Sequence, residues 1–193
     1  MSSRNKILNA VKLGKPALQP LPASHQLQAV LYEDAPAKFI ETFSGIGGQV
    51  IAVNSLADVD SFIAGNFSAT NIISNIPALK NVSFLNKNID PHELENIELA
   101  ILPAQFGVAE NGALWMTEND MGIRALPFIC QQLAVVLSKK DIVSNMQQAY
   151  DIIAETNYGF AAFVAGPSKT ADIEQSLVLG AHGPKGMIIF LVE

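Results

Sequence analysis

The stretch Gln131-Gln-Leu-Ala-Val-Val-Leu137 is an almost uninterrupted apolar run. Runs of this length are typical of strands that are buried on both faces of a parallel sheet. Shorter runs rich in β-branched or aromatic residues occur at 49–53, 70–74, 82–85, 98–102, 159–165 and 187–192. Helical patterns lie between several of them. This alternation predicts an α/β domain with three layers, in which a mainly parallel sheet carries helices on both faces.

Three helices are predicted from their capping residues and apolar spacing. The first starts at Asp34 and stops near Gly45, and the second starts at Ser55, with Asp58 completing a capping box, and stops at Gly65. A long third helix is expected after Ser138 and Asp141, with a core-facing stripe of Ile142, Met146, Ala149, Tyr150 and Ile153.

The composition predicts one domain at residues 31–193, because 49% of the 193 residues are hydrophobic and no long linker interrupts the chain. Residues 1–30 are expected to form a short amphipathic helix and a proline-rich arm. The net charge of -6 and the thin spread of 12 Lys and Arg offer no basic stripe, so nucleic acid is excluded as a partner. No signal peptide and no apolar run of about 20 residues is seen, so we expect a cytoplasmic protein without membrane insertion.

The single cysteine, Cys130, cannot supply the several thiolates of an iron–sulfur cluster or a structural zinc site. It follows an apolar pair, which indicates a buried and inert thiol. His25 and His92 have no partners at metal-ligand spacing. We therefore expect no metal site and no cofactor of the chain's own.

Two tracts carry the chemistry, and we interpret them as one site that is split in the sequence. In Gly166-Pro-Ser-Lys-Thr-Ala-Asp-Ile-Glu174, a strand is expected to run into a helix at 169–177, whose first N–H groups would bind an anion. The positive charge of Lys169 suits a carboxylate or phosphate, whereas Asp172 suits a hydroxyl group. The predicted ligand contacts are Gly166, Ser168, Lys169, Thr170 and Asp172. The alternative is that Ser168, Thr170 and Asp172 only cap the helix.

The same tract continues to Gly180-Ala-His-Gly-Pro184, where His182 lies between small residues and is a candidate acid–base catalyst next to the ligand-binding Gly183. A lone loop histidine that only fixes a turn is the alternative. The second tract, Gly107-Val-Ala-Glu-Asn-Gly112, contains the candidate catalytic residue Glu110 and the candidate ligand residue Asn111. Glu110 could be a base, a nucleophile or an anion that orders the loop. Asn111-Gly112 is also an ordinary hairpin signal.

At these residues the chain resembles the lactate-utilisation domain (LUD) family, and specifically its small LutC or YkgG type. The resemblance rests on the later tract together with Phe106-Gly-Val-Ala-Glu-Asn-Gly112. The chain differs at Asn111, where threonine is common, and at Lys169, where arginine is common. The resemblance implies a fold like that of the NagB, RpiA and CoA-transferase group. It also implies a bacterial three-protein system that oxidises L-lactate to pyruvate through iron–sulfur partners, here LutA-like and LutB-like proteins.

Three functions are therefore considered. The first is an accessory component of lactate oxidation that binds a small hydroxy- or oxo-acid, or the partner proteins. The second is an acyl- or CoA-transferase-like enzyme that uses Glu110, suggested by the short Glu110-Asn-Gly112 motif, although few Lys or Arg residues lie near it for the phosphates of CoA. The third is an interaction module without a small ligand.

Overall fold

The computed structural model describes residues 2–17, 19, 29–67, 71–86, 88–154, 156–171, 177–180 and 182–193. In this part of the chain, a six-stranded sheet has the order β1-β12-β7-β4-β2-β3, and every pairing in it is parallel. Its strands are β1 (Gln49–Val53), β2 (Ile72–Ser74), β3 (Ser83–Phe84), β4 (Leu99–Pro103), β7 (Gln132–Ser138) and β12 (Gly186–Val192). The mainly parallel α/β fold predicted from the apolar runs is thereby confirmed.

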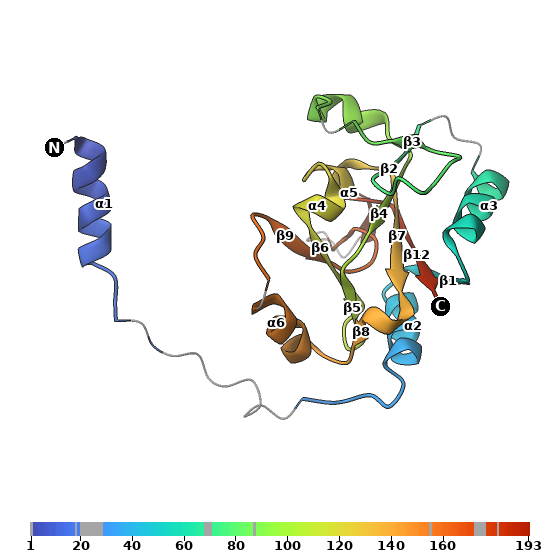
Figure 1. Ribbon diagram of the computed structural model, residues 1–193, viewed down its shortest axis with the longest axis horizontal. Coiled ribbons are helices and arrows are strands. Elements are labelled where there is room, and N and C mark those ends of the chain that lie inside the picture. The colour runs from blue at the N-terminus through green and yellow to red at the C-terminus, as the bar shows by residue number, and fades with distance from the viewer. Residues whose placement is uncertain are drawn as a thin grey trace.

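Both faces of this sheet are buried, and alternate residues of each strand serve the two sides. In β12, Ile188 and Phe190 pack against α3 (Leu56–Asn66) through Val59 and Ile63, whereas Ile189 points to the other side. That other side is covered by α2 (Ala35–Gly45), α4 (Glu118–Met121), α5 (Leu126–Ile129) and a second sheet, as Figure 1 shows. Helices on both faces explain why the strands are apolar throughout.

The second sheet is four-stranded, with the order β8-β5-β6-β9, and the sequence analysis did not predict it. It consists of β5 (Phe106–Val108), β6 (Ala113–Thr117), β8 (Ile142–Val143) and β9 (Ala161–Val164). β5 and β6 form an antiparallel hairpin through Asn111-Gly112, as that dipeptide indicated, and β9 is antiparallel to β6. The run at 159–165 therefore does not belong to the parallel sheet.

The helix predicted after Ser138 begins later than expected. A 3-10 turn, η3 (Lys139–Asp141), and the short strand β8 come first, and α6 (Met146–Ala154) then follows. Ile142 is thus in a strand, and Tyr150 is 60% exposed rather than core-facing. The helix lies over the outer face of the second sheet, where Ala149 and Ile153 pack with Phe106 and Trp115.

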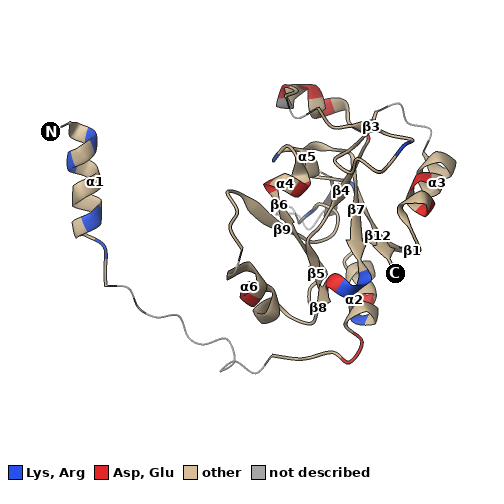
Figure 2. Ribbon diagram, viewed as in Figure 1, with Lys and Arg blue, Asp and Glu red and all other residues tan. Residues whose placement is uncertain are grey.

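The N-terminal helix α1 (Ser3–Leu13) buries none of its residues. Figure 1 shows it apart from the α/β body, and Figure 2 shows Lys and Arg but no acidic residue on it. Its apolar side chains Ile7, Leu8, Val11 and Leu13 are 48–88% exposed. Among the described residues, neither this helix nor any other is long and apolar enough to cross a bilayer. The remaining helical segment is the 3-10 helix η2 (Pro91–Asn96).

Candidate functional site

A groove of about 660 Å³ brings together segments that are far apart in the sequence. Asn111 comes from the β5–β6 hairpin, residues 163–168 come from the end of β9 and the loop after it, Lys169 begins the next strand, and residues 182–184 precede β12. Ile46 after α2 and Phe128 of α5 complete the lining. The predicted residues that line this groove are Asn111, Gly166, Ser168, Lys169, His182 and Gly183.

Two glycines allow the hairpin and the later loop to pack on the same side chain. Gly112 and Gly166 both have φ of +71°, a conformation that residues with a side chain rarely adopt. A β-carbon would lie 3.2 Å from Cδ1 of Ile46 at Gly112 and 3.1 Å from the same atom at Gly166. Both tracts therefore contact the side chain of Ile46. A larger residue than glycine at position 112 or 166 would have a strained backbone and would press on this side chain.

Backbone hydrogen bonds hold the two parts of the later tract together. The N–H of Ser168 donates to the carbonyl of Pro184 (2.9 Å), and the N–H of Gly180 donates to the carbonyl of Ser168 (3.1 Å). Gly183 lies against Ser168, because a β-carbon there would be 3.2 Å from Cβ of the serine. The loop that carries His182 is thereby fixed beside Ser168, which directly precedes Lys169 at the start of the following strand.

The helix predicted at 169–177 is not formed. Instead β10 (Lys169–Ala171) and β11 (Leu177–Leu179) form a two-stranded antiparallel sheet. Gly166 and Gly180, both at positive φ, precede and follow these two strands. Thr170 pairs with Val178 in their register, and both residue types have a high propensity for extended backbone. The prediction of an anion site at a helix N-terminus is therefore wrong. Thr170 lies in β10, and Asp172 lies outside the described residues.

The groove is rich in hydrogen-bond donors. It contains the Lys169 ammonium, the His182 imidazole, the Ser168 hydroxyl and the Asn111 amide, and no described lining residue is acidic. The oxygen of Asn111 already accepts the N–H of Ala113 (3.0 Å), which leaves the amide NH₂ available. Such a set of donors suits an anion, and a carboxylate in particular.

Lys169 has a second neighbour, the end of α2. Its Nζ would lie 2.9 Å from a β-carbon placed on Gly47, just beyond the last turn of that helix. A cation at a helix C-terminus is favoured by the partial negative charge of the free carbonyl groups. The ammonium group therefore lies close to the C-terminal end of α2 as well as beside the groove.

Glu110 is not among the described residues that line the groove, and its side chain contacts α6. Its Oε1 accepts a hydrogen bond from the N–H of Met146 (2.9 Å), the first residue of that helix. The carboxylate thus satisfies one more free N–H at the start of α6, next to Asn145, whose Oδ1 accepts the N–H of Gln148 (3.0 Å). A negative charge at this end is stabilised by the helix dipole. A catalytic role for Glu110 stays a prediction.

Sequence reasoning missed the apolar lining of the groove. Nothing in the sequence marked Ile46, Phe128 or Phe163 as part of a site. The close glycine contacts that identify Ile46 exist only in the folded chain. Trp115 is 7% exposed and packs against Phe163 at 4.6 Å between ring centroids, as expected of a wall or core residue.

The buried thiol of Cys130 is unsuited to chemistry at neutral pH. The residue is 1% exposed within the main core, and this burial raises the pKa of the thiol to about 12. The prediction of a buried thiol is confirmed, and its lack of reactivity stays a prediction. Among the described residues, no group of three His, Cys, Asp or Glu side chains is placed to hold a metal ion.

The architecture defines an α/β protein with a parallel sheet and a donor-rich groove built from two glycine-containing tracts. A family profile described as the LUD domain matches residues 85–192, which include both tracts. The chain therefore belongs to the LUD domain family, as the resemblance indicated.

Curated relatives that it matches include proteins named Lactate utilization protein C. The proteins of that name from Bacillus pumilus (strain SAFR-032) and Bacillus subtilis (strain 168) are 30% and 31% identical to it over 118 and 114 residues. Each match covers 55% of this chain, and 49% and 46% of the respective relative. The chain thus spans about half the length of these curated relatives.

One solved structure is similar in fold. The crystal structure of a DUF162 family protein from Deinococcus radiodurans has a TM-score of 0.63 with 19% sequence identity. The alignment covers 90% of this chain and 100% of that chain. At this level of identity the likeness shows the α/β fold alone.

Proposed function

We propose that this chain takes part in bacterial lactate utilisation, and that its groove binds a small hydroxy- or oxo-acid through the carboxylate. Its membership of the LUD domain family and the names of its relatives support the pathway. The observation that carries the ligand proposal is the convergence of Asn111, Ser168, Lys169 and His182 on one groove whose described lining has no acidic side chain.

The two charged or titratable groups have separate proposed tasks. Lys169 provides the fixed positive charge, and a charge-assisted bond to a carboxylate is about twice as strong as a neutral one. His182 is exposed at the groove, so its ring reaches solvent and ligand alike. We assign it the contact with the hydroxyl or oxo group, where an imidazole can donate or accept a proton.

The redox centres are proposed to belong to partner proteins. Oxidation of lactate to pyruvate removes electrons and protons, so the reaction needs an electron acceptor. We propose cytoplasmic LutA-like and LutB-like partners whose iron–sulfur clusters take up the electrons. In this scheme the chain contributes the binding of the acid, or of the partners, and needs no cofactor of its own.

A thermal-shift titration with L-lactate and with pyruvate tests the binding proposal. Ligand at about 100 times its dissociation constant stabilises a fold by about 2.7 kcal/mol. Lys169→Met and His182→Ala should reduce this stabilisation, whereas the matched control Lys80→Met should not, because Lys80 is exposed and outside the groove. No stabilisation of the wild-type protein by either acid would refute the ligand assignment.

Co-purification with the iron–sulfur partners separates binding of an acid from a purely docking role. If Lys169→Met loses ligand stabilisation while the partner complex stays intact, the groove is a small-molecule site. If the same variant loses only the partner complex and the wild-type protein binds no acid, the groove docks a protein instead. For this comparison, Lys169→Met must have the same thermal midpoint as the wild-type protein in the absence of ligand.

A further inference from the structure

A second cavity, of about 460 Å³, shares no lining residue with the groove. It opens where β4 and β7 end, because Gln105 follows β4 and Lys140 and Asp141 form η3 directly after β7. These strands are neighbours in the parallel sheet. The carboxyl ends of adjacent parallel strands are the usual location of ligand sites in open α/β sheets, and the volume is within their usual range of about 300–1,000 Å³.

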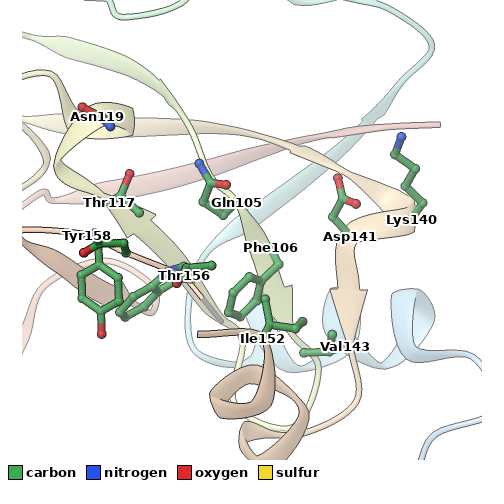
Figure 3. A pocket seen from close by; sticks show the side chains of 12 residues that line it. Gln105, Phe106, Thr117, Asn119, Lys140, Asp141, Val143, Ile152, Thr156 and Tyr158 are labelled. Atoms are coloured by element: carbon green, nitrogen blue, oxygen red, sulfur yellow. The ribbon is translucent and has the colours of Figure 1, made fainter. Parts of the chain in front are cut away.

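One wall of this cavity presents hydrogen-bond acceptors. Nε2 of Gln105 donates to the buried carboxylate of Asp120 (2.7 Å), which fixes the amide and leaves its oxygen free. The hydroxyl of Thr117 also donates to Asp120 (2.7 Å), so this oxygen can only accept a hydrogen bond from a ligand. Figure 3 shows the polar ends of Gln105, Thr117 and Asp141 on the same side of the cavity, with Lys140 beside them.

The opposite wall is mainly apolar and aromatic, although the polar Thr156 and Asn157 also belong to the lining. Phe106 and Trp115 of the second sheet are stacked with an interplanar angle of 21°, and Tyr158 meets Trp115 edge to face. Ile152 of α6 and Val143 of β8 complete this side, which lies below the polar groups in Figure 3. Tyr158 and Ile152 remain 40% and 41% exposed although they lie at an otherwise packed surface.

This two-sided lining restricts the ligand. A molecule that fits must have hydrogen-bond donors along one edge and an apolar remainder, which excludes sugars with hydroxyl groups all round. Lys140 at the end of the acceptor row suits a ring nitrogen or an anionic substituent, and within the described chain neither Lys140 nor Asp141 makes a side-chain ion pair or hydrogen bond. We propose that this cavity binds an amino-substituted heteroaromatic ring of the aminopurine class.

The emission of Trp115 provides a local probe, because it is the single tryptophan of the chain and lines the cavity. Adenosine should change this emission in a saturable way. Inosine, in which a carbonyl replaces the amino donor, should bind about tenfold more weakly, since one hydrogen bond to a charged acceptor is lost. Xylose should have no effect.

Two variants test whether the change arises from this cavity. Asp141→Asn should weaken adenosine binding about tenfold, whereas Asp151→Asn, an exposed residue of α6 outside the lining, should leave it unchanged. Both changes are isosteric and at partly or fully exposed positions, so the fold should be kept. The proposal is overturned if adenosine leaves the emission unchanged, if inosine binds equally well, or if Asp141→Asn and Asp151→Asn behave alike.

Discussion

The contact between Glu110 and α6 makes a prediction that separates a capping role from a catalytic one. Glu110→Ala removes the acceptor for the Met146 N–H, and loss of a helix cap costs about 0.5–2 kcal/mol. Glu110→Gln keeps an acceptor and removes only the charge, which is worth about 0.3–1 kcal/mol next to a helix N-terminus. For a protein of this size, 1 kcal/mol corresponds to a change of about 2–4 °C in the thermal midpoint.

Differential scanning calorimetry should therefore show a graded loss, with Glu110→Ala less stable than Glu110→Gln. Glu95→Gln is the matched control, because Glu95 is exposed and has no hydrogen bond or ion pair among the described residues. Stabilisation by lactate or pyruvate should be equal in all of these proteins. The capping argument fails if Glu110→Gln melts like the wild type, and a catalytic role gains support if hydroxylamine traps an acyl group on Glu110 after incubation with acyl-CoA.

Three further predictions concern the groove and the core. Gly166→Ala should cost about 1–3 kcal/mol in urea denaturation, because the position has positive φ and the new methyl group would press on Ile46; an unchanged midpoint would contradict this. Cys130 should resist iodoacetamide near pH 8 until the protein unfolds. Because burial raises its pKa above the ordinary 9.0, its contribution to stability is complete below about pH 9 and is lost as the pH rises towards 12, which a pH series of denaturation curves would reveal. Phe190→Ala should cost about 3–5 kcal/mol and Phe84→Ala less than about 0.5, since the rings are 0% and 56% exposed; equal losses would refute the assigned burial.

The parallel sheet could be predicted because its strands are apolar on both sides. Val135 and Val136 point to opposite faces of the sheet, and both pack against hydrophobic residues. The run at 131–137 therefore lacks the alternation of apolar and polar residues that is typical of a surface strand. The second sheet could not be predicted in the same way. β5 has only three residues, one of them Gly107, and β8 has two, so neither carries a period long enough to recognise.

The candidate site shows the same division. The polar tracts were visible in the sequence because they combine glycine with charged and hydroxyl residues, and six of the nine predicted site residues line one groove. The backbone between them was predicted wrongly: residues after Ser168 have a helix-like composition, but β10 pairs with β11 across a hairpin. The pairing partners lie six to ten residues further along the chain, so the propensity of residues 169–171 alone does not decide their conformation.

The register of the main sheet has a consequence for biosynthesis. Gln49 of β1 pairs with Ile188 of β12, and β12 is the only described strand that β1 contacts in that sheet. During synthesis, β1 therefore has no partner strand in this sheet until the ribosome has made β12, more than 130 residues later. During that interval an exposed β-strand is available to other chains, and we expect chaperone dependence and expression temperature to affect yield more strongly than the finished molecule's stability would suggest.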